Sequence, residues 1–207
     1  MSKKIEQRAS LLHVETRAAE DGKKTLVGYA AVFNSDTTIG DYFIERIDPG
    51  AFNKAIKGDV RALVNHDPGR VIGRTKSGTL KLAVDNKGLS VEIDVPDTAD
   101  GRDLMTLVER GDISGMSIGF MVTRQEWDDT GDIPMRTILE AELFEVSAVA
   151  FPAYEETQLS ARSIETAKTE LEEMRAEAKR KKDNDAAAKR RIAAREAHME
   201  QVIRGIR

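Results

Sequence analysis

Alternating apolar and polar positions divide most of the chain into short strands. Residues 25–33 form a run rich in β-branched and aromatic side chains that closes on turn-forming residues, and residues 42–47 form a second run. Apolar residues then alternate through 80–84 and again through 89–95, on either side of a polar segment that contains a glycine. This spacing predicts two strands joined as a β-hairpin.

A strand with a serine among small residues is predicted over residues 115–122. Ile118 and Phe120 fall on one face of its alternating pattern, which leaves Ser117 on the other face beside glycine neighbours. We therefore expect the Ser117 hydroxyl to be unobstructed, as a nucleophile requires. Most serines near glycines lie in turns or at strand edges, so this pattern alone does not establish catalysis.

The remaining strands are predicted with less regular patterns. A long strand spans residues 136–150, and a short one over residues 61–67 should break at Pro68, because proline cannot continue a strand ladder. Residues 1–8 are polar and should be loose, and residues 11–15 suit a first short strand.

Two helices are predicted in this part of the chain. Residues 97–100 offer helix N-caps before an amphipathic segment that Gly111 ends. Residues 48–58 form a strand-to-helix joint, in which Asp48 caps the helix, a proline occupies its first turn and Gly58 ends it.

From about residue 157 the pattern changes to a helical one with a heptad spacing. The apolar seam is interrupted by polar residues at Lys181 and Asp185. One spacing of seven runs through Ile164, Leu171, Ala178, Asp185, Ile192, Met199 and Ile206, and Ala167, Met174, Lys181, Ala188, Arg195 and Val202 interleave with it. This extension is either a partner-binding or self-associating arm or a solvated helix, and the seam is too imperfect to decide.

The pattern as a whole predicts a mostly β or α+β body, for which a barrel is one possible arrangement of the strands, followed by a helical extension. We place the body at residues 1–158 and the charged, coiled-coil-like extension at residues 159–207. The whole chain has 207 residues, 40% of them hydrophobic, which is enough for the body to bury an ordinary core. No apolar run approaches the roughly 20 residues needed to cross a bilayer, and the first residues do not resemble a secretory signal. We expect a soluble protein of a reducing compartment, since cysteine is absent.

Charge divides along the same boundary. The formal net charge is -4, but residues 160–207 contain more lysine and arginine than aspartate and glutamate, so an acidic body carries a basic extension. Because both signs are interspersed there, a solvated helix explains the pattern better than a nucleic-acid-binding arm.

The candidate catalytic residues lie in the body. Of the histidines His13, His66 and His198, only His66 stands at a strand end beside a loop. Glu145 is a lone carboxylate in an apolar strand, so it either pairs with a partner such as a histidine or faces water at a sheet edge. Together with Ser117, these residues could supply a nucleophile, a general base and an orienting acid, although their spacing does not show that they meet.

Five short segments resemble the phage prohead (capsid maturation) protease family. They follow the order of that family and cover about residues 25–157. They are Gly-Tyr-Ala-Ala-Val-Phe-Asn (28–34), Glu-Arg-Ile-Asp-Pro-Gly-Ala-Phe (45–52), Asn-His-Asp (65–67), Gly-Met-Ser-Ile-Gly-Phe (115–120) and Glu-Val-Ser-Ala-Val-Ala-Phe-Pro-Ala-Tyr (145–154).

This resemblance implies a herpesvirus-protease-like β-barrel with surrounding helices and a cofactor-free serine endopeptidase. Such an enzyme trims scaffolding segments from the major capsid protein, and trims itself, inside the assembling prohead in the host cytoplasm. The resemblance assigns Ser117 as the nucleophile and His66 as the base, with Ser114 at a variable place of the motif. The third member stays open between Glu145 and Asp67, because the herpesvirus enzymes use a second histidine there.

Two other classes of function compete with a serine protease. A non-enzymatic scaffold or assembly protein would work through the helical extension, with Ser117 and His66 structural. A metallohydrolase using His66 and Asp67 is poorly supported, since the chain lacks an HExxH motif and a cysteine cluster.

Overall fold

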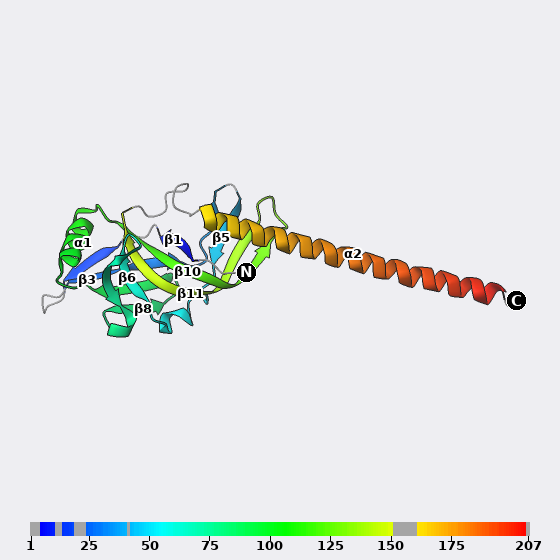
Figure 1. The fold of residues 1–207 in the computed structure, drawn as a ribbon, viewed down its shortest axis with the longest axis horizontal. Helices are drawn as coiled ribbons and strands as arrows, with labels where there is room; N and C mark the ends of the chain where they lie inside the picture. Colours follow the sequence, from blue (N-terminus) through cyan, green and yellow to red (C-terminus); the bar gives the residue numbers. More distant parts are fainter. Residues whose placement is uncertain (1–4, 11–13, 19–23, 41, 151–160, 206–207) are drawn as a thin grey trace. The chain divides into compact units, whose positions relative to one another are not determined.

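The computed structural model describes residues 5–10, 14–18, 24–40, 42–150 and 161–205. The chain divides into two compact units, Met1–Ile164 and Glu165–Arg207. The first unit, which we call the body, contains the strands and one α-helix (Figure 1). Most of the second unit is one long helix.

The elements of the described chain follow in sequence order. They are β1 (Glu6–Ser10), β2 (Glu15–Ala18), β3 (Lys24–Val32), β4 (Thr37–Ile39), β5 (Phe43–Ile47), the 3-10 turn η1 (Ala55–Lys57), β6 (Arg61–Val64), β7 (Asp67–Arg74), the 3-10 turn η2 (Thr75–Ser77), β8 (Leu80–Val84), β9 (Gly88–Asp94), α1 (Ala99–Arg110), β10 (Gly115–Asp128), β11 (Met135–Val149) and α2 (Ala161–Gly205).

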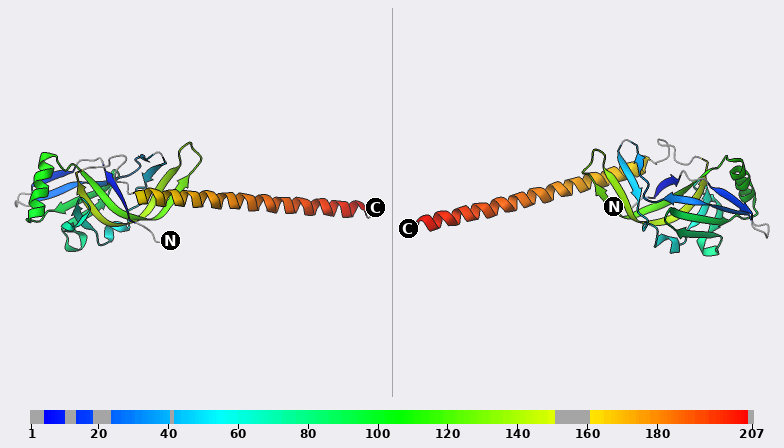
Figure 2. Two further views of the ribbon diagram at one scale, coloured as in Figure 1. Left: turned by 45° about the horizontal axis from the view of Figure 1, so that its top comes forward. Right: turned by 180° about the vertical axis from the view of Figure 1, so that it is seen from behind.

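The described strands form two open sheets. The larger sheet runs β1-β10-β11-β5-β4, and β6 joins it by pairing with β11 and carries β7 on its other side. The smaller sheet runs β2-β3-β9-β8. Both views in Figure 2 show the long β10–β11 hairpin running along the body, with α1 at one end of the sheets. The mostly β, α+β class predicted from the sequence is confirmed, with two open sheets in the described residues in place of a single closed barrel.

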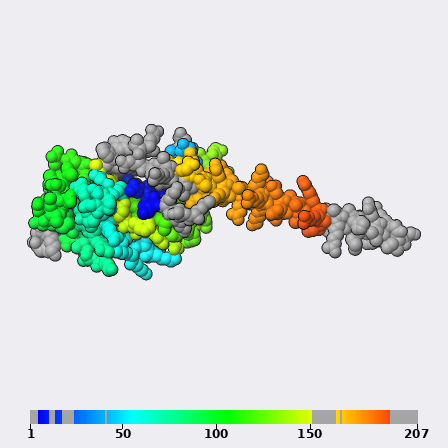
Figure 3. All heavy atoms as spheres, viewed as in Figure 1, coloured from blue at the N-terminus to red at the C-terminus, as the bar shows by residue number. Residues whose placement is uncertain are grey.

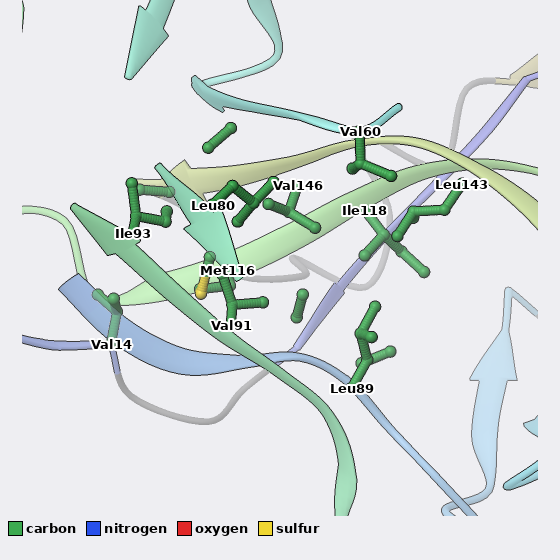
Figure 4. Close-up of a cluster of buried hydrophobic side chains, with 14 of the residues drawn as sticks. Val14, Val60, Leu80, Leu89, Val91, Ile93, Met116, Ile118, Leu143 and Val146 are labelled. Carbon is green, nitrogen blue, oxygen red and sulfur yellow. The ribbon is translucent and has the colours of Figure 1, made fainter. Parts of the chain in front are cut away.

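The hydrophobic core lies between the two sheets. Ile118 and Val146 point from β10 and β11 toward Leu89, Val91 and Ile93 of β9 (Figure 4). All five side chains are almost completely buried. Burying a side chain of this size stabilises the fold by about 1.5–3 kcal/mol, so this layer holds the two sheets together. The hairpin predicted from alternation, now β8 and β9, supplies one side of the core and is confirmed.

Helix α1 begins and ends where its sequence predicts. The Thr98 hydroxyl accepts a hydrogen bond from the Gly101 backbone N–H, and Gly111 ends the helix in the left-handed conformation at φ +81°. Arg70 of β7 donates to Asp100 in the first turn at 2.8 Å. This contact joins α1 to the β6–β7 region, and the two lie side by side in the space-filling view (Figure 3).

The helix predicted over residues 48–58 does not form. The chain makes successive turns there, and the only helical piece is the single 3-10 turn η1, which ends at Gly58. Asp48 does act as a cap, but of a turn, because its carboxylate accepts a hydrogen bond from the Gly50 backbone N–H at 2.7 Å. A glycine near the start of so short a segment opposes helix nucleation, which explains the result.

Two strand predictions also change. The chain reverses at Asn65 and His66, before Pro68, and Pro68 becomes the second residue of β7. In the described chain β7 pairs with β6 along one edge only, so a residue without an N–H is tolerated. The segment expected to be loose, residues 1–8, includes the first three residues of β1, while residues 11–13 of the predicted first strand lie outside the described residues.

Buried charges explain why β1 is ordered although its sequence is polar. Glu6 and Arg8 of β1 meet Glu45 of β5 and Arg136 of β11 in one cluster on the core side of the larger sheet. Arg136 donates to both carboxylates at 2.9 Å, and Arg8 donates to Glu45 at 2.6 Å. Arg136 is fully buried and Glu45 is 3% exposed. Because two guanidinium groups face two carboxylates, each buried charge is compensated, and β1 is held in place.

Burial opposes the ionised form of Glu45, but Arg8 and Arg136 outweigh it and hold the pKa of the Glu45 carboxyl below its ordinary value. A lowered pKa in the folded state stabilises the protein above the unfolded-state value of about 4.3. That contribution is lost as the pH falls through the lower folded-state value.

Helix α2 makes up most of the second unit and confirms the predicted helical extension. It is a continuous helix of 45 residues. Between Glu172 and Ile192 its side chains are exposed, apart from Met174, which is half-buried. The heptad seam therefore faces solvent in this stretch, and its use for self-association stays a prediction. None of the helices that the structure describes has the length and apolar character needed to span a membrane.

We predict that Glu45→Gln lowers the free energy of unfolding at pH 7 by about 3–5 kcal/mol, because it leaves buried guanidinium charge uncompensated. Chemical denaturation at several pH values measures this. Below about pH 4.3 the stability of the wild-type protein should fall more steeply than that of the variant. Glu140→Gln, which removes an exposed pair with Lys54, is the matched control and should change little. Equal losses for both variants would show that the buried cluster does not stabilise β1.

Candidate active site

One face of the β10–β11 pair collects the candidate catalytic groups. Ser117 lies directly opposite Ser147, and Gly119 lies directly opposite Glu145. Residues opposite each other in an antiparallel pair share a face, as do residues two apart in one strand. These four residues therefore lie on the face away from Ile118.

A β-bulge brings Glu145 to this face. The register shifts between Gly119 and Phe120, so that Gly119 pairs with Glu145 whereas Phe120 pairs with Leu143. In a regular strand Leu143 and Glu145 would share a face, and the carboxylate would enter the core. The extra residue in β11 reverses the alternation, so Val146 is buried in the core and Glu145 faces the other way.

His66 is held in the tight turn between β6 and β7. Val64 pairs with Asp67, and the two residues between them have positive φ, 50° for Asn65 and 60° for His66. Such φ values are those of a type I′ hairpin turn, which asparagine adopts readily and histidine less often. The Asn65 backbone N–H donates to the Ala148 carbonyl at 2.9 Å, which fixes the turn against β11.

Three side chains form a hydrogen-bonded cluster at this turn. His66 Nδ1 and Glu145 Oε1 are 2.5 Å apart. Ser147 Oγ donates to Glu145 Oε2 at 2.6 Å and accepts from the His66 backbone N–H at 3.2 Å. The side chains of His66 and Glu145 are only 15% and 13% exposed. An ionised Glu145 must be the acceptor from Nδ1–H, so the tautomer of neutral His66 leaves the Nε2 lone pair free to act as a base.

Gly119 provides the space for the carboxylate. A Cβ built at this position would overlap the Glu145 carboxylate, with its nearest atom Oε1. Any side chain larger than hydrogen would therefore displace Glu145 from His66. The sequence already showed a glycine two residues after Ser117, in the Gly-Met-Ser-Ile-Gly-Phe segment. The reason for that glycine becomes visible only when the position of β11 is known.

Ser117 is buried, which corrects the expectation of an unobstructed hydroxyl. Its exposed fraction is 2%, and its Oγ donates to the Arg8 carbonyl at 3.0 Å. β1 pairs along the other edge of β10 with Ala9 opposite Ser117, which brings the Arg8 carbonyl within reach of Oγ. Small neighbours within β10 could not reveal this partner on another strand. Between the described residues no hydrogen bond joins Ser117 to His66.

The other candidates take separate positions. Asp67 accepts a hydrogen bond from the Gly69 backbone N–H at 2.8 Å, so it stabilises a local turn, and Glu145 is the acid that contacts His66. Ser114 precedes β10, where its carbonyl accepts from the Val14 backbone N–H. His13 and the side chain of His198 lie outside the described residues. No group of three metal-ligating side chains occurs in the described part of the chain.

Comparison with known proteins adds an independent observation. The sequence model of a family described as caudovirus prohead serine protease matches residues 12–172. The prohead protease of Enterobacteria phage HK97 is 34% identical over 155 residues, which cover 71% of this chain and 64% of that protein. The prohead protease of Escherichia phage T5 is 32% identical over 95 residues, or 46% of this chain and 42% of that protein. The chain thus spans less than two thirds of either relative.

A solved structure is also similar. The bacteriophage T4 capsid assembly protease matches with a TM-score of 0.45 and 14% sequence identity, over 70% of this chain and 99% of that chain.

We predict that Gly119→Ala breaks the contact between His66 and Glu145, because the added methyl group occupies the place of the carboxylate. The measurement is the imidazole N–H resonance of His66 in ¹⁵N NMR spectra, which should move or disappear. Overpacking should also lower the stability by about 1–3 kcal/mol. Gly131→Ala, where a Cβ meets only an ordinary contact, is the control and should leave the resonance unchanged. An unchanged resonance in Gly119→Ala would contradict the role given to Gly119.

Proposed function

Because the chain belongs to the caudovirus prohead serine protease family, we propose that it is a serine endopeptidase acting through Ser117, His66 and Glu145. The observation that carries the proposal is the 2.5 Å contact between His66 Nδ1 and Glu145 Oε1, on the same face of the sheet as Ser117. A histidine oriented by a carboxylate, at the sheet face that also carries a serine, supplies the three groups of a nucleophilic hydrolase.

The proposed reaction has two halves. His66 Nε2 takes the proton of the Ser117 hydroxyl while Oγ attacks the peptide carbonyl carbon, and His66 then gives that proton to the leaving amine nitrogen. This leaves an acyl group on Ser117. Water attacks the ester, His66 takes a proton from the water and returns it to Oγ, and the new carboxylic acid leaves. Glu145 stabilises the imidazolium that forms in both halves.

The hydroxyl must change its partner before the reaction can start. In the resting structure Ser117 donates to the Arg8 carbonyl. Catalysis requires Oγ to exchange this acceptor for His66 Nε2, and the rotamers of a serine side chain are separated by about 120°. Hydrogen bonds of catalytic groups are often absent in the unliganded enzyme and form in the substrate complex, which is consistent with this resting state.

The proposed substrates are capsid proteins. The relatives are named prohead proteases, which supports cleavage of scaffolding segments of the major capsid protein, and of the chain itself, within the assembling prohead in the host cell. We assign the chemistry to residues 1–158. Residues 159–207 would serve as the arm that brings the enzyme into the shell or joins two copies, which the solvent-facing stretch of α2 supports.

We predict that Ser117→Ala abolishes cleavage of the capsid-protein precursor, because it removes the hydroxyl that is proposed to attack the peptide carbonyl. The measurement is a gel of precursor and product after co-expression. His66→Ala should also abolish cleavage, and Glu145→Gln should reduce it less severely, since the imidazole keeps a hydrogen-bond partner. Ser114→Ala is the matched control and should cleave normally. Continued cleavage by Ser117→Ala would overturn the assignment, and the absence of cleavage by every form, wild type included, would favour the non-enzymatic scaffold.

We also predict that removing residues 173–207, the part beyond the family match, reduces incorporation of the protein into proheads while it spares peptide-bond chemistry. The reason is that this segment contributes none of Ser117, His66 and Glu145. The protein content of purified proheads and labelling of Ser117 by a fluorophosphonate measure the two properties separately. Equal packaging of the truncated and full-length chains would refute the arm's role.

A further inference from the structure

Ser147 is a buried hydroxyl that the proposed reaction leaves without a role. It is completely buried, and it lies on β11 directly opposite Ser117. Neither of its hydrogen bonds serves the strand ladder. One goes to the side chain of Glu145, and the other comes from the backbone of His66, which is 81 positions away in the sequence.

Through these two hydrogen bonds Ser147 contacts both His66 and Glu145. The hydroxyl proton is donated to Glu145 Oε2, while the lone pair of Oγ accepts the His66 backbone N–H. Rotation about the last bond of a glutamate side chain is only weakly restricted, so a single contact through Oε1 would leave the carboxylate free to turn. The second contact fixes its plane toward Nδ1 of His66.

The same hydroxyl supports the unusual backbone of the turn. His66 has a φ of 60°, a conformation that costs free energy for a residue other than glycine. Its backbone N–H donates to Ser147 Oγ, which stabilises this conformation of His66. The same hydroxyl therefore holds the backbone that aims the imidazole and orients the carboxylate that the imidazole contacts. Ser90 shows the contrasting, ordinary use of a strand serine, because its Oγ donates to the backbone carbonyl of Ala83 on the neighbouring strand.

We propose that Ser147 is a positioning residue of this active site, which holds the Glu145 carboxylate and the His66 backbone in the geometry that general-base catalysis requires. The effect on catalysis rests on the proposed function, but the effect of Ser147 on the positions of His66 and Glu145 can be tested without catalysis. Ser147 acts through His66 and Glu145 and does not itself contact the reacting atoms.

The test compares the full-length wild-type protein with Ser147→Ala, Ser147→Cys and the control Ser90→Ala. The first readout is the rate at which a fluorophosphonate labels Ser117, measured over a series of probe concentrations to separate probe binding from the acylation step. Loss of orientation should lower the maximal labelling rate about tenfold to a hundredfold in Ser147→Ala, with probe affinity unchanged. The second readout is the His66 imidazole N–H resonance, which a merely structural role for Ser147 would leave in place.

The expected result is a slowed acylation step together with a shifted or lost His66 resonance in Ser147→Ala, and wild-type behaviour in Ser90→Ala. Ser147→Cys keeps nearly the size of the side chain but is a weak donor, so it tests the hydrogen bond even where the alanine variant does not fold. Wild-type labelling and an unchanged resonance in the folded variants would overturn the proposal. If the wild-type protein is not labelled but the resonance still depends on Ser147, the proposed enzyme fails while the positioning of His66 and Glu145 stands.

Discussion

The antiparallel pairing of β10 with β11 is the interaction on which the rest of the structure depends. Its regular part places Ile118 and Val146 on the face that meets the smaller sheet, and therefore builds the core. Its bulge moves Glu145 to the opposite face, where Ser117 already lies. One pair of strands thus supplies both the hydrophobic core and the candidate catalytic groups. The alternation of side chains places them on opposite faces, and the single extra residue in β11 puts Glu145 on the face of Ser117.

Ionisable side chains meet on both faces of the larger sheet, with different consequences. On the core face Arg136 and Glu45 belong to a cluster whose charges balance, so its effect is to hold β1 beside β10. On the other face a carboxylate meets a histidine, whose charge depends on proton transfer. Only the second arrangement can change state during a reaction, because guanidinium groups do not lose their protons in proteins.

β1 links these two regions. The ion pairs of the core face fix its position, and its backbone then accepts the hydrogen bond of the Ser117 hydroxyl at the Arg8 carbonyl. In the proposed mechanism a buried Ser117 bonded to the neighbouring strand is the resting arrangement, in which His66 is oriented but not yet hydrogen-bonded to the hydroxyl. The family match through residue 172 and the geometry of His66 and Glu145 support the same class of chemistry from independent observations.

Local pattern was sufficient for the β8–β9 hairpin, for α1 with its caps and for the two long strands, because alternation, capping residues and glycine act over a few positions. The residue types of the site, a serine between glycines, a histidine at a strand end and a carboxylate in an apolar run, could also be read from the sequence. Their convergence could not, since it depends on the bulge in β11, on the positive φ of His66 and on pairing between segments about 80 positions apart. The hydrogen bond from Ser117 to β1 was likewise decided only by tertiary structure, because the charges that order that polar strand lie on β5 and β11, far from it in the chain.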